Sequence, residues 1–452
     1  MLDLTQGDDT LKTLIIGGVA AGMSCASKLR RLDPKRDIVV YEKGHDLSYG
    51  ACGMPYYLSD VIDDDKKLVA RTKDQFEEKG IHVKTGYEVT KLDPKSKTIR
   101  GITEDGNAFS DTYDQVLIAT GASSVHIPVD NHDLKGIYPL NSLQNAITLK
   151  KELQSAQTVA IIGAGFIGME VAENLIEMGK TVHMIELSDQ VLAPYDKMYA
   201  DMAEAALKDA GVHIHTNEGL KGYRGTDKVE TVITDQNEYP VDLVIEAVGV
   251  RPNTKFVSDI GLDMLKNGAI IVNEYGETNL EDVYAAGDCV AYPHLLLDEP
   301  FFVPLGTHAN KLGRVIAERL AGDENAHFKG VLGSNILKVM DLTVCKTGLT
   351  MKDNDRYDHL DLDCVDVKAK DHAGYYPGAE LMNIRLVFDK QSKVIKGAQI
   401  VGKKGVANRI NILATIIDQG LKADEVSMLD LAYSPPFQPV WDPIQVAANQ
   451  IK

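Results

Sequence analysis

The chain has 452 residues, of which 44% are hydrophobic and 25% charged, as in ordinary globular proteins. A formal net charge of −18 argues against nucleic acid or an anionic membrane as the main partner. No apolar run reaches the ~18 residues that span a bilayer, the N-terminus does not resemble a secretory signal, and the five scattered cysteines suggest neither a disulfide framework nor a zinc site. We expect a cytoplasmic protein of about three domains without a metal centre.

The first part of the chain is typical of a dinucleotide-binding unit. Residues 12–18 predict a buried strand running into glycines, followed by a helix over 23–32 and a second strand over 37–41 that ends at Glu42. In such a Rossmann unit the helix N-terminus holds a pyrophosphate and the acid accepts a hydrogen bond from a ribose hydroxyl. Because Val19 stands where the motif GxGxxG has its middle glycine, this copy is weak when taken alone.

A single cysteine, Cys52, follows this unit in the stretch SYGACGMPYY. Its small neighbours, Gly50, Ala51 and Gly53, would let the sulfur approach a flavin ring. The alternative is a buried structural cysteine in a turn, which is the commoner role of an isolated cysteine. The rest of the chain has to decide between these two roles.

The same order of elements returns in a second copy. A strand over 158–162 leads into the full GxGxxG motif at 163–168, and a later strand over 181–187 carries Glu186. Two such copies imply two dinucleotides, and electron transfer from a nicotinamide to a flavin is the simplest use for both. A carboxylate at Glu186 would bond the 2′-hydroxyl of NADH and repel the 2′-phosphate of NADPH, so we expect NADH to be preferred.

Three further segments, 115–122, 243–253 and 283–288, predict buried strands that end in glycine turns or an acid. They fall where a flavin domain interrupted by a nicotinamide domain requires them. In the last quarter, strands are predicted within 333–349, 381–388 and 394–401, followed by an amphipathic helix over 407–419. The segment between Met351 and Arg356 is expected to be a solvated loop.

These motifs resemble those of the flavin- and nicotinamide-dependent disulfide reductases over essentially the whole chain. The matching segments are ATGA at 119–122, AAGD at 285–288, the second glycine motif, SYGACG, and the endings HAGYYPGA and AYSPPFQPVWDP. Within this family the chain is similar to the single-cysteine branch. That branch contains coenzyme A-disulfide reductase, the sulfur, polysulfide and persulfide reductases, and NADH oxidase and peroxidase.

The resemblance implies an α/β fold with two Rossmann-like domains, one for FAD and one for NAD, and a C-terminal α+β dimerisation domain. The FAD-binding domain would comprise 1–120 and 249–325, the NAD(P)H-binding domain 121–248, and the dimerisation domain 326–452. The protein would be a homodimer with active sites shared between subunits. A C-terminal domain that packs only on its own chain is the alternative.

By the same resemblance, Asp288 bonds the ribityl chain of FAD, Phe166 covers the nicotinamide face of the flavin, and Glu170 lies near the nicotinamide. Since Tyr57 replaces the second cysteine of other family members, Cys52 has to cycle as a thiolate, mixed disulfide, persulfide or sulfenic acid. The expected cofactor-binding residues are Gly17, Gly18, Ala20, Ala21, Gly22, Glu42, Lys43, Ser48, Thr120, Gly121, Gly163, Gly165, Phe166, Ile167, Gly168, Glu170, Glu186, Gly249, Gly287 and Asp288.

Two positions bear on the electron acceptor. Peroxidases and oxidases of the branch carry a histidine where this chain has Ala20, which counts against efficient peroxide or oxygen reduction. Typical coenzyme A-disulfide reductases carry an asparagine where this chain has Ala51, which counts against a strict specificity for coenzyme A disulfide. We therefore expect reduction of coenzyme A disulfide, coenzyme A persulfide or polysulfide through Cys52. The alternatives are an NADH oxidase or peroxidase that uses a sulfenic acid, and a flavoprotein that passes electrons to a protein partner.

The thiolate that leaves when Cys52 attacks a disulfide needs a proton donor or a hydrogen bond. Coenzyme A-disulfide reductases are thought to use two tyrosines of the other subunit. The matching residues here are Tyr433 and Tyr375, with adjacent Tyr376 as a rival of the latter. The alternative is that both tyrosine clusters simply pack the dimer interface.

Overall fold

The computed structural model describes residues 10–452, which form two compact units. The first unit runs to Met54 and adds Asp64–Ser124 and Val250–Val331. The second unit comprises Pro55–Asp63, Val125–Gly249 and Leu332–Lys452. The chain therefore passes from one unit to the other several times, as in a domain into which another has been inserted.

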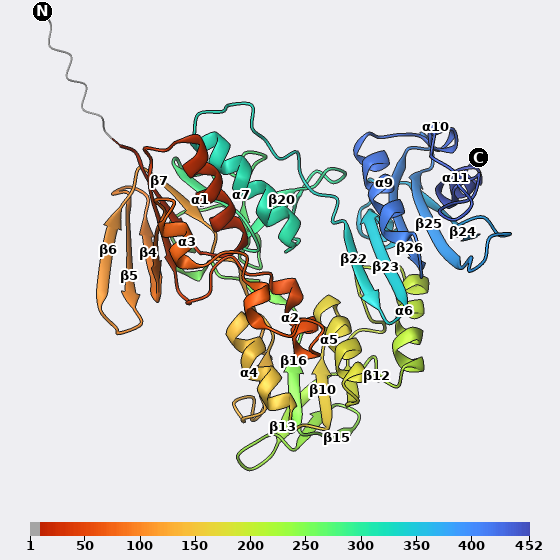
Figure 1. The fold of residues 1–452 in the computed structure, drawn as a ribbon, viewed down its shortest axis with the longest axis horizontal. Helices are drawn as coiled ribbons and strands as arrows, with labels where there is room; N and C mark the ends of the chain where they lie inside the picture. Colours follow the sequence, from red (N-terminus) through yellow and green to blue (C-terminus); the bar gives the residue numbers. More distant parts are fainter. Residues whose placement is uncertain (1–9) are drawn as a thin grey trace, which may run out of the picture. The chain divides into compact units, whose positions relative to one another are not determined.

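A five-stranded parallel sheet forms the centre of the first unit (Figure 1). Its order is β19 (Val283–Ala285), β7 (Gln115–Ile118), β1 (Lys12–Ile16), β2 (Asp37–Glu42) and β3 (His82–Thr85). The central strands are almost continuously buried, as expected for a parallel sheet covered on both faces. Helices α1 (Ala20–Leu32) and α7 (Gly306–Leu320) lie side by side. Gly313 permits their close approach, because a Cβ at this position would lie only 2.4 Å from the carbonyl oxygen of Ala21.

Smaller elements complete this unit. They are an antiparallel sheet of β4 (Tyr87–Asp93), β5 (Thr98–Thr103) and β6 (Ala108–Thr112), the pair β8 (Ala122–Ser124) and β17 (Val250–Pro252), the strands β18 (Ile270–Ile271), β20 (Val290–Pro293) and β21 (Pro300–Phe301), and helix α3 (Lys73–Glu77). The pair of β8 and β17 marks the place where the chain leaves this unit and returns to it.

The second unit begins with a copy of the same parallel arrangement. Its order is β12 (His213–His215), β11 (Thr181–Ile185), β10 (Thr158–Ile162), β16 (Leu243–Glu246) and β9 (Ile137–Pro139). The associated helices are α4 (Leu143–Leu153), α5 (Phe166–Glu177) and α6 (Lys197–Asp209), and β13 (Leu220–Arg224), β14 (Thr231–Thr234) and β15 (Glu238–Pro240) form an antiparallel sheet. The two Rossmann-type sheets predicted from the sequence are thus both present.

The C-terminal part of the second unit is an antiparallel sheet with helices. The strand order is β22 (Asn335–Val339), β23 (Leu342–Gly348), β26 (Ile395–Gly402), β25 (Leu381–Asp389) and β24 (Leu362–Lys370), and the helices are α9 (Val406–Asp418), α10 (Ala423–Ser427) and α11 (Pro443–Ala448). This sheet is joined to the preceding part of the unit by polar contacts. Asp196, which precedes α6, accepts hydrogen bonds from Arg385 at 2.9 Å and from Gln399 at 2.5 Å.

One local prediction was wrong. Residues Met351–Arg356 form helix α8 instead of a loop. The cause is a capping box, in which Asp353 accepts hydrogen bonds from the main-chain N–H and the hydroxyl of Thr350 at 2.8 and 2.9 Å. The predicted α/β fold class with a C-terminal α+β domain is confirmed. Between residues 10 and 452, no helix is long and apolar enough to cross a membrane.

Candidate active site

The first glycine loop packs so tightly that side chains are excluded at its two ends. Gly17 has φ +112°, and a Cβ there would lie 2.1 Å from the carbonyl oxygen of Ala119. A Cβ at Gly22 would lie 2.0 Å from the carbonyl oxygen of Gly17. Ala20 and Ala21 form the first turn of α1, which has no side-chain cap. The first-turn N–H groups of α1 can therefore serve an anionic ligand.

The second glycine loop repeats this geometry. A Cβ at Gly163 would lie 2.6 Å from the carbonyl oxygen of Ala247, and one at Gly168 would lie 2.1 Å from that of Gly163. A Cβ at Gly165, by contrast, would meet no atom within 4 Å, and helix α5 has no side-chain cap. The open position at Gly165 leaves room for a phosphate group to approach the main chain, which is the function of the middle glycine in this motif.

The acids that end the second strands hold their own glycine loops. Glu42 accepts hydrogen bonds from the N–H groups of Gly18 and Gly44 at 2.6 and 2.7 Å. Glu186 accepts from those of Ala164 and Ser188, both at 2.8 Å. Sequence reasoning assigned these acids to ribose hydroxyls and missed this second role. A carboxylate has about four lone-pair sites, so each can still accept a ribose hydroxyl.

Cys52 lies at the surface, in the 3-10 helix Ala51–Gly53. Ser48, four residues before Cys52, has φ +47° and donates its main-chain N–H to the carbonyl oxygen of Gly18 at 3.0 Å. The cysteine loop is therefore attached directly to the first glycine loop. This exposure and this attachment do not fit the alternative of a buried structural cysteine.

Three of the other cysteines are buried and chemically inert. Burial raises the pKa of the Cys25 thiol to about 12 and that of Cys289 to about 11, and it also raises the pKa of Cys345. Since the thiolate is the reactive form, these three side chains are packing residues. Cys364 is half-buried, so Cys52 is the exposed cysteine of the chain.

The segments around the predicted flavin site meet within the first unit. The Thr120 hydroxyl donates to the carbonyl oxygen of Asn253 at 2.8 Å, and the Asn253 amide donates to that of Thr120 at 3.0 Å. Gly121, at φ +64°, and Gly287, at φ +90°, form the turns next to them. Sequence reasoning did not single out Asn253, although it lies in the segment 243–253 that it had marked.

Asp288 is half-buried, and burial raises its pKa. Within the described residues 10–452, no side chain or main-chain N–H donates a hydrogen bond to its carboxylate, so an incoming hydroxyl can do so. Lys43 is less suited to the role expected of it, because its ammonium is exposed and forms an ion pair with Glu88 at 2.9 Å. The residues around Asp288 and the first glycine loop thus fit FAD, and those around Gly165 fit a nicotinamide dinucleotide.

Helix α5 carries the residues expected near the nicotinamide. Phe166 begins the helix and its ring lies edge-on to that of Tyr195, with centroids 6.3 Å apart. Ile167 is half-buried beside it. One turn along the helix, burial raises the pKa of Glu170 to about 7. Gly249, at φ +108° and with open space where a Cβ would lie, ends the segment Val125–Gly249 of the same unit.

The two predicted tyrosines form a pair in the C-terminal part. The hydroxyls of Tyr375 and Tyr433 lie 2.6 Å apart, and this hydrogen bond raises the pKa of Tyr433. Both side chains are exposed, at 76% and 44%. Tyr376, the rival, instead places its ring edge-on to that of His372, with centroids 5.7 Å apart.

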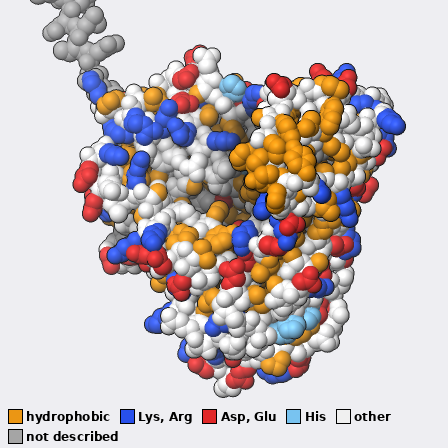
Figure 2. Space-filling view, turned by 45° about the vertical axis from the view of Figure 1, so that its right-hand side comes forward, with side chains coloured by type: hydrophobic (Ala, Val, Ile, Leu, Met, Phe, Trp, Pro, Cys, Tyr) orange, Lys and Arg blue, Asp and Glu red, His pale blue; other side chains and the backbone are white. Residues whose placement is uncertain are grey.

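The tyrosine pair belongs to an exposed hydrophobic patch. Figure 2 shows hydrophobic side chains gathered over the C-terminal part. The exposed large hydrophobic side chains of this part are Ile336, Tyr375, Tyr376, Leu381, Met428, Tyr433, Phe437, Val440 and Trp441. A patch of this kind marks a protein-protein interface. A pocket of about 590 Å³ adjoins it, with Tyr376, Tyr433 and Phe437 on its wall and buried His372 and Arg409 beneath.

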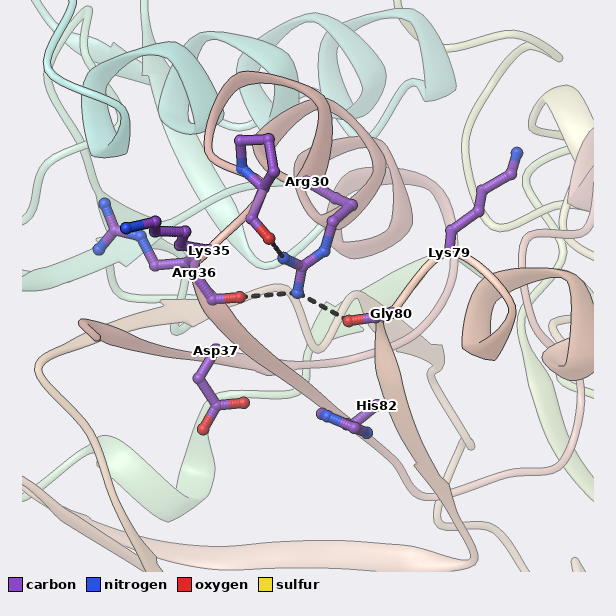
Figure 3. Close-up of a pocket in the computed structure, with 8 residues that line it drawn as sticks. Arg30, Lys35, Arg36, Asp37, Lys79, Gly80 and His82 are labelled. Carbon is purple, nitrogen blue, oxygen red and sulfur yellow. Dashed lines mark hydrogen bonds between the residues drawn. The ribbon is translucent and has the colours of Figure 1, made fainter. Parts of the chain in front are cut away.

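A smaller pocket in the first unit, of about 410 Å³, is not a candidate (Figure 3). It lies at the amino ends of β2 and β3, whereas dinucleotides bind at the carboxyl ends of parallel strands. The Arg30 guanidinium in its wall donates to the carbonyl oxygens of Pro34, Arg36 and Gly80 at 2.6–2.7 Å. Its role is therefore to join loops. In the described part of the chain, no group of three or more His, Cys, Asp and Glu side chains could hold a metal ion.

Known proteins show the same combination of features. Residues 11–309 match the family model "Pyridine nucleotide-disulphide oxidoreductase", and residues 335–443 match the dimerisation domain of that family. The chain is 35% identical over 444 residues to the NAD(P)H coenzyme A polysulfide/persulfide reductase of Pyrococcus horikoshii, which covers 98% of both chains. It is 33% identical over 430 residues to the coenzyme A disulfide reductase of Staphylococcus epidermidis, covering 94% of this chain and 96% of that protein.

Among solved structures, the water-forming NADH oxidase of Lactobacillus brevis bound to NADH superposes with a TM-score of 0.94 at 26% identity, covering 98% of each chain. The matched dimerisation domain makes the protein a homodimer, and the exposed patch around Tyr433 lies on that domain. The chain belongs to the pyridine nucleotide-disulphide oxidoreductases and is an enzyme of that family that uses FAD and NAD(P)H.

Proposed function

We propose that this enzyme uses NADH to reduce a low-molecular-weight acceptor, coenzyme A disulfide, coenzyme A persulfide or polysulfide, through Cys52. The observation that carries the proposal is the exposed cysteine loop, which Ser48 attaches to the first glycine loop at 3.0 Å. The names of the relatives from Pyrococcus horikoshii and Staphylococcus epidermidis support the same class of acceptor.

The proposed binding residues divide between the two units. FAD would be held in the first unit by Gly17, Gly18, Ala20, Ala21, Gly22, Glu42, Ser48, Thr120, Gly121, Gly287 and Asp288, and NADH in the second by Gly163, Gly165, Phe166, Ile167, Gly168, Glu170, Glu186 and Gly249. When bound, these cofactors supply the hydride and the two electrons that cleave a disulfide. Lys43 contributes charge at the edge of the first site and no more, given its pairing with Glu88.

The Cys52 thiolate attacks one sulfur of the acceptor, so that a mixed disulfide forms and the acceptor's own sulfur-sulfur bond breaks. The departing thiolate takes a proton. Two electrons then cleave the mixed disulfide, which releases the second thiolate and restores the Cys52 thiolate. For coenzyme A disulfide the sum is one NADH and one proton consumed and two thiols formed.

Tyr375 and Tyr433 are the proposed proton donors for the departing thiolate. Their 2.6 Å hydrogen bond lets the hydroxyl of one stabilise the other while a proton is transferred. Their exposure on the dimerisation domain supports action in the active site of the partner subunit. In this proposal, covalent attachment of coenzyme A to Cys52 is the intermediate with coenzyme A disulfide.

The likeness to the Lactobacillus brevis NADH oxidase favours a second candidate, an oxidase with a sulfenic acid at Cys52. Alanine at position 20 opposes it, because an oxidase of this branch is expected to carry histidine there. A side-by-side survey of rates with coenzyme A disulfide, coenzyme A persulfide, polysulfide, peroxide and oxygen tests the choice. The proposal requires the rate with one of the first three acceptors to exceed the rates with peroxide and with oxygen. A faster rate with oxygen would establish the second candidate instead.

The proposal extends to domain limits and location. Residues 1–120 and 249–325 would bind FAD, 121–248 NADH, and 326–452 would dimerise; the unit boundaries at Ser124 and Gly249 support the first two limits. A cytoplasmic location suits an enzyme that keeps an exposed thiol reduced and draws on NADH.

A further inference from the structure

The segment that follows Cys52 belongs to the nicotinamide-binding unit. The chain passes from the first unit to the second between Met54 and Pro55, and it returns at Asp64. The 3-10 helix that carries Cys52 continues directly into helix α2 (Met54–Leu58). Cys52 therefore lies in a loop that Ser48 attaches to the first unit, and three residues after it the chain enters the second unit.

The first contact of residues 55–63 is with helix α5. The Ser59 hydroxyl, just beyond the end of α2, donates to the side-chain oxygen of Asn174 at 2.5 Å. Asn174 is only 1% exposed, and its amide donates to the main-chain oxygen of Glu170 at 2.7 Å. Asn174 lies one turn after Glu170 and two turns after Phe166 on the same helix. A chain of hydrogen bonds thus joins the proposed nicotinamide site to the end of α2.

The second contact is with helix α4. The Lys150 ammonium forms an ion pair with Asp60 at 2.6 Å and lies 3.9 Å from the centre of the Tyr57 ring. One cation thus binds residues on both sides of Ser59. Figure 1 shows α2 beside α4 and α5. Three separate polar contacts, from two helices, hold a segment that is only nine residues long.

We propose that Asn174 and Lys150 are positioning residues that make the reactivity of Cys52 depend on occupancy of the nicotinamide site. The inference rests on the proposed function, since it assigns the reacting sulfur to Cys52. A nucleotide seated at the start of α5 restrains that helix, and Asn174 transmits the restraint to Ser59 and α2. The Cys52 segment would have a more reactive and a less reactive arrangement. A nucleotide can change their populations only if it binds the two arrangements with different affinities. Acceptor chemistry is thereby coordinated with the supply of hydride.

The test uses the FAD-containing dimer and iodoacetamide as the probe. The alkylation rate of Cys52 is followed by mass spectrometry with and without saturating NAD⁺, in the wild type and in Lys150→Met, Asn174→Ala and Ser59→Ala. We expect NAD⁺ to change the wild-type rate by about fivefold or more, the lower end of ordinary coupling between sites. In the three variants, the ratio of the alkylation rates with and without NAD⁺ should approach one. The matched control Lys151→Met changes an exposed lysine on the same helix and should retain the wild-type ratio.

The dissociation constant of NAD⁺ is measured in parallel by fluorescence. Simple shielding of the sulfur by the nucleotide would persist in variants that still bind NAD⁺, whereas transmission through Asn174 or Lys150 would not. A wild-type ratio of one, or a ratio retained in Lys150→Met and Ser59→Ala, would overturn the inference. Lys150→Met keeps the test decisive if the buried Asn174→Ala change prevents folding. Loss of the proposed function is distinguishable, because it would appear as acceptor reduction that survives Cys52→Ser.

Discussion

The hydroxyl groups of Tyr375 and Tyr433 lie 2.6 Å apart, although 58 positions separate the two residues in the chain. The two loops are also joined by their main chains, since the Ala373 N–H donates to the carbonyl oxygen of Pro435 at 3.3 Å. The pairing distinguishes Tyr375 from its neighbour Tyr376, which packs against a histidine ring. Two hydroxyls held together in this way can act on a single leaving group.

Replacing either tyrosine of the pair should therefore slow acceptor turnover. We expect Tyr375→Phe and Tyr433→Phe to leave reduction of the flavin by NADH intact, because that step does not involve the departing thiolate. The double variant should lose less than the product of the two single losses, since both hydroxyls serve one group. Steady-state and stopped-flow rates measure the two steps. Tyr376→Phe is the matched control, and a loss there equal to that of Tyr375→Phe would contradict the assignment.

Cys52→Ser should separate the two halves of the reaction. The variant should keep flavin reduction and NADH oxidation with an artificial dye, because neither needs the sulfur. It should lose reduction of disulfide, persulfide or polysulfide, because covalent exchange requires a thiolate. Cys364→Ser, at a half-buried cysteine, should behave as the wild type. Acceptor reduction retained in Cys52→Ser would mean that Cys52 is structural.

Glu186 predicts a preference for NADH, measured as the ratio of kcat/KM for the two nucleotides. In Glu186→Gln the ratio should fall by roughly tenfold or more, since a carboxylate and a phosphate a few Å apart repel by a few kcal/mol at an effective dielectric of about 20. The glutamine oxygen can still accept from the N–H of Ala164, whereas the hydrogen bond from the N–H of Ser188 to the second carboxylate oxygen is lost. A wild-type kcat/KM for NADPH equal to or above that for NADH would disprove the assignment.

Glu170 predicts a pH dependence of flavin reduction. Burial raises its pKa to about 7, so its carboxyl ionises near neutrality. Because hydride transfer leaves positive charge on the nicotinamide ring, the stopped-flow rate should rise with pH through about 7, and Glu170→Gln should lose this rise. Stability should change in the opposite direction. The unfolded state releases the proton first, so the folded wild type loses stability relative to Glu170→Gln as pH rises from about 4.5 to about 7.

A cluster of histidines predicts sensitivity to acid. The His183 ring stacks on those of His213 and His215, with centroids 5.0 and 5.6 Å apart. Burial, together with the charges of these two neighbours, lowers the pKa of His183. The unfolded state therefore takes up the proton first, and stability is lost as pH falls below about 6.5, by at most about 1.4 kcal/mol per pH unit for this group. In urea unfolding, the free energy of unfolding of His183→Phe should fall less with decreasing pH than that of the wild type. The exposed His132→Gln should show the same fall as the wild type.

Much of the fold could be predicted from the sequence because its signals are local. Strand β10 coincides with the predicted range 158–162, and helix α9 begins and ends within one residue of the predicted 407–419. Glycine spacing and apolar periodicity depend only on near neighbours in the chain, so they remain valid without tertiary information. Helix α8 was missed because its capping box was overlooked at Thr350, and that signal was also local.

The arrangement of the candidate site was decided by tertiary structure. The sequence, through its resemblance to a family, identified Cys52 and assigned Tyr375 and Tyr433 to one leaving thiolate. It gave no indication that the two tyrosine hydroxyls share a hydrogen bond, or that Ser59 contacts Asn174, 115 positions away. A hydrogen bond between distant residues depends on how helices and loops pack in three dimensions. No periodicity or local spacing encodes that packing, so only the folded chain reveals which polar groups meet.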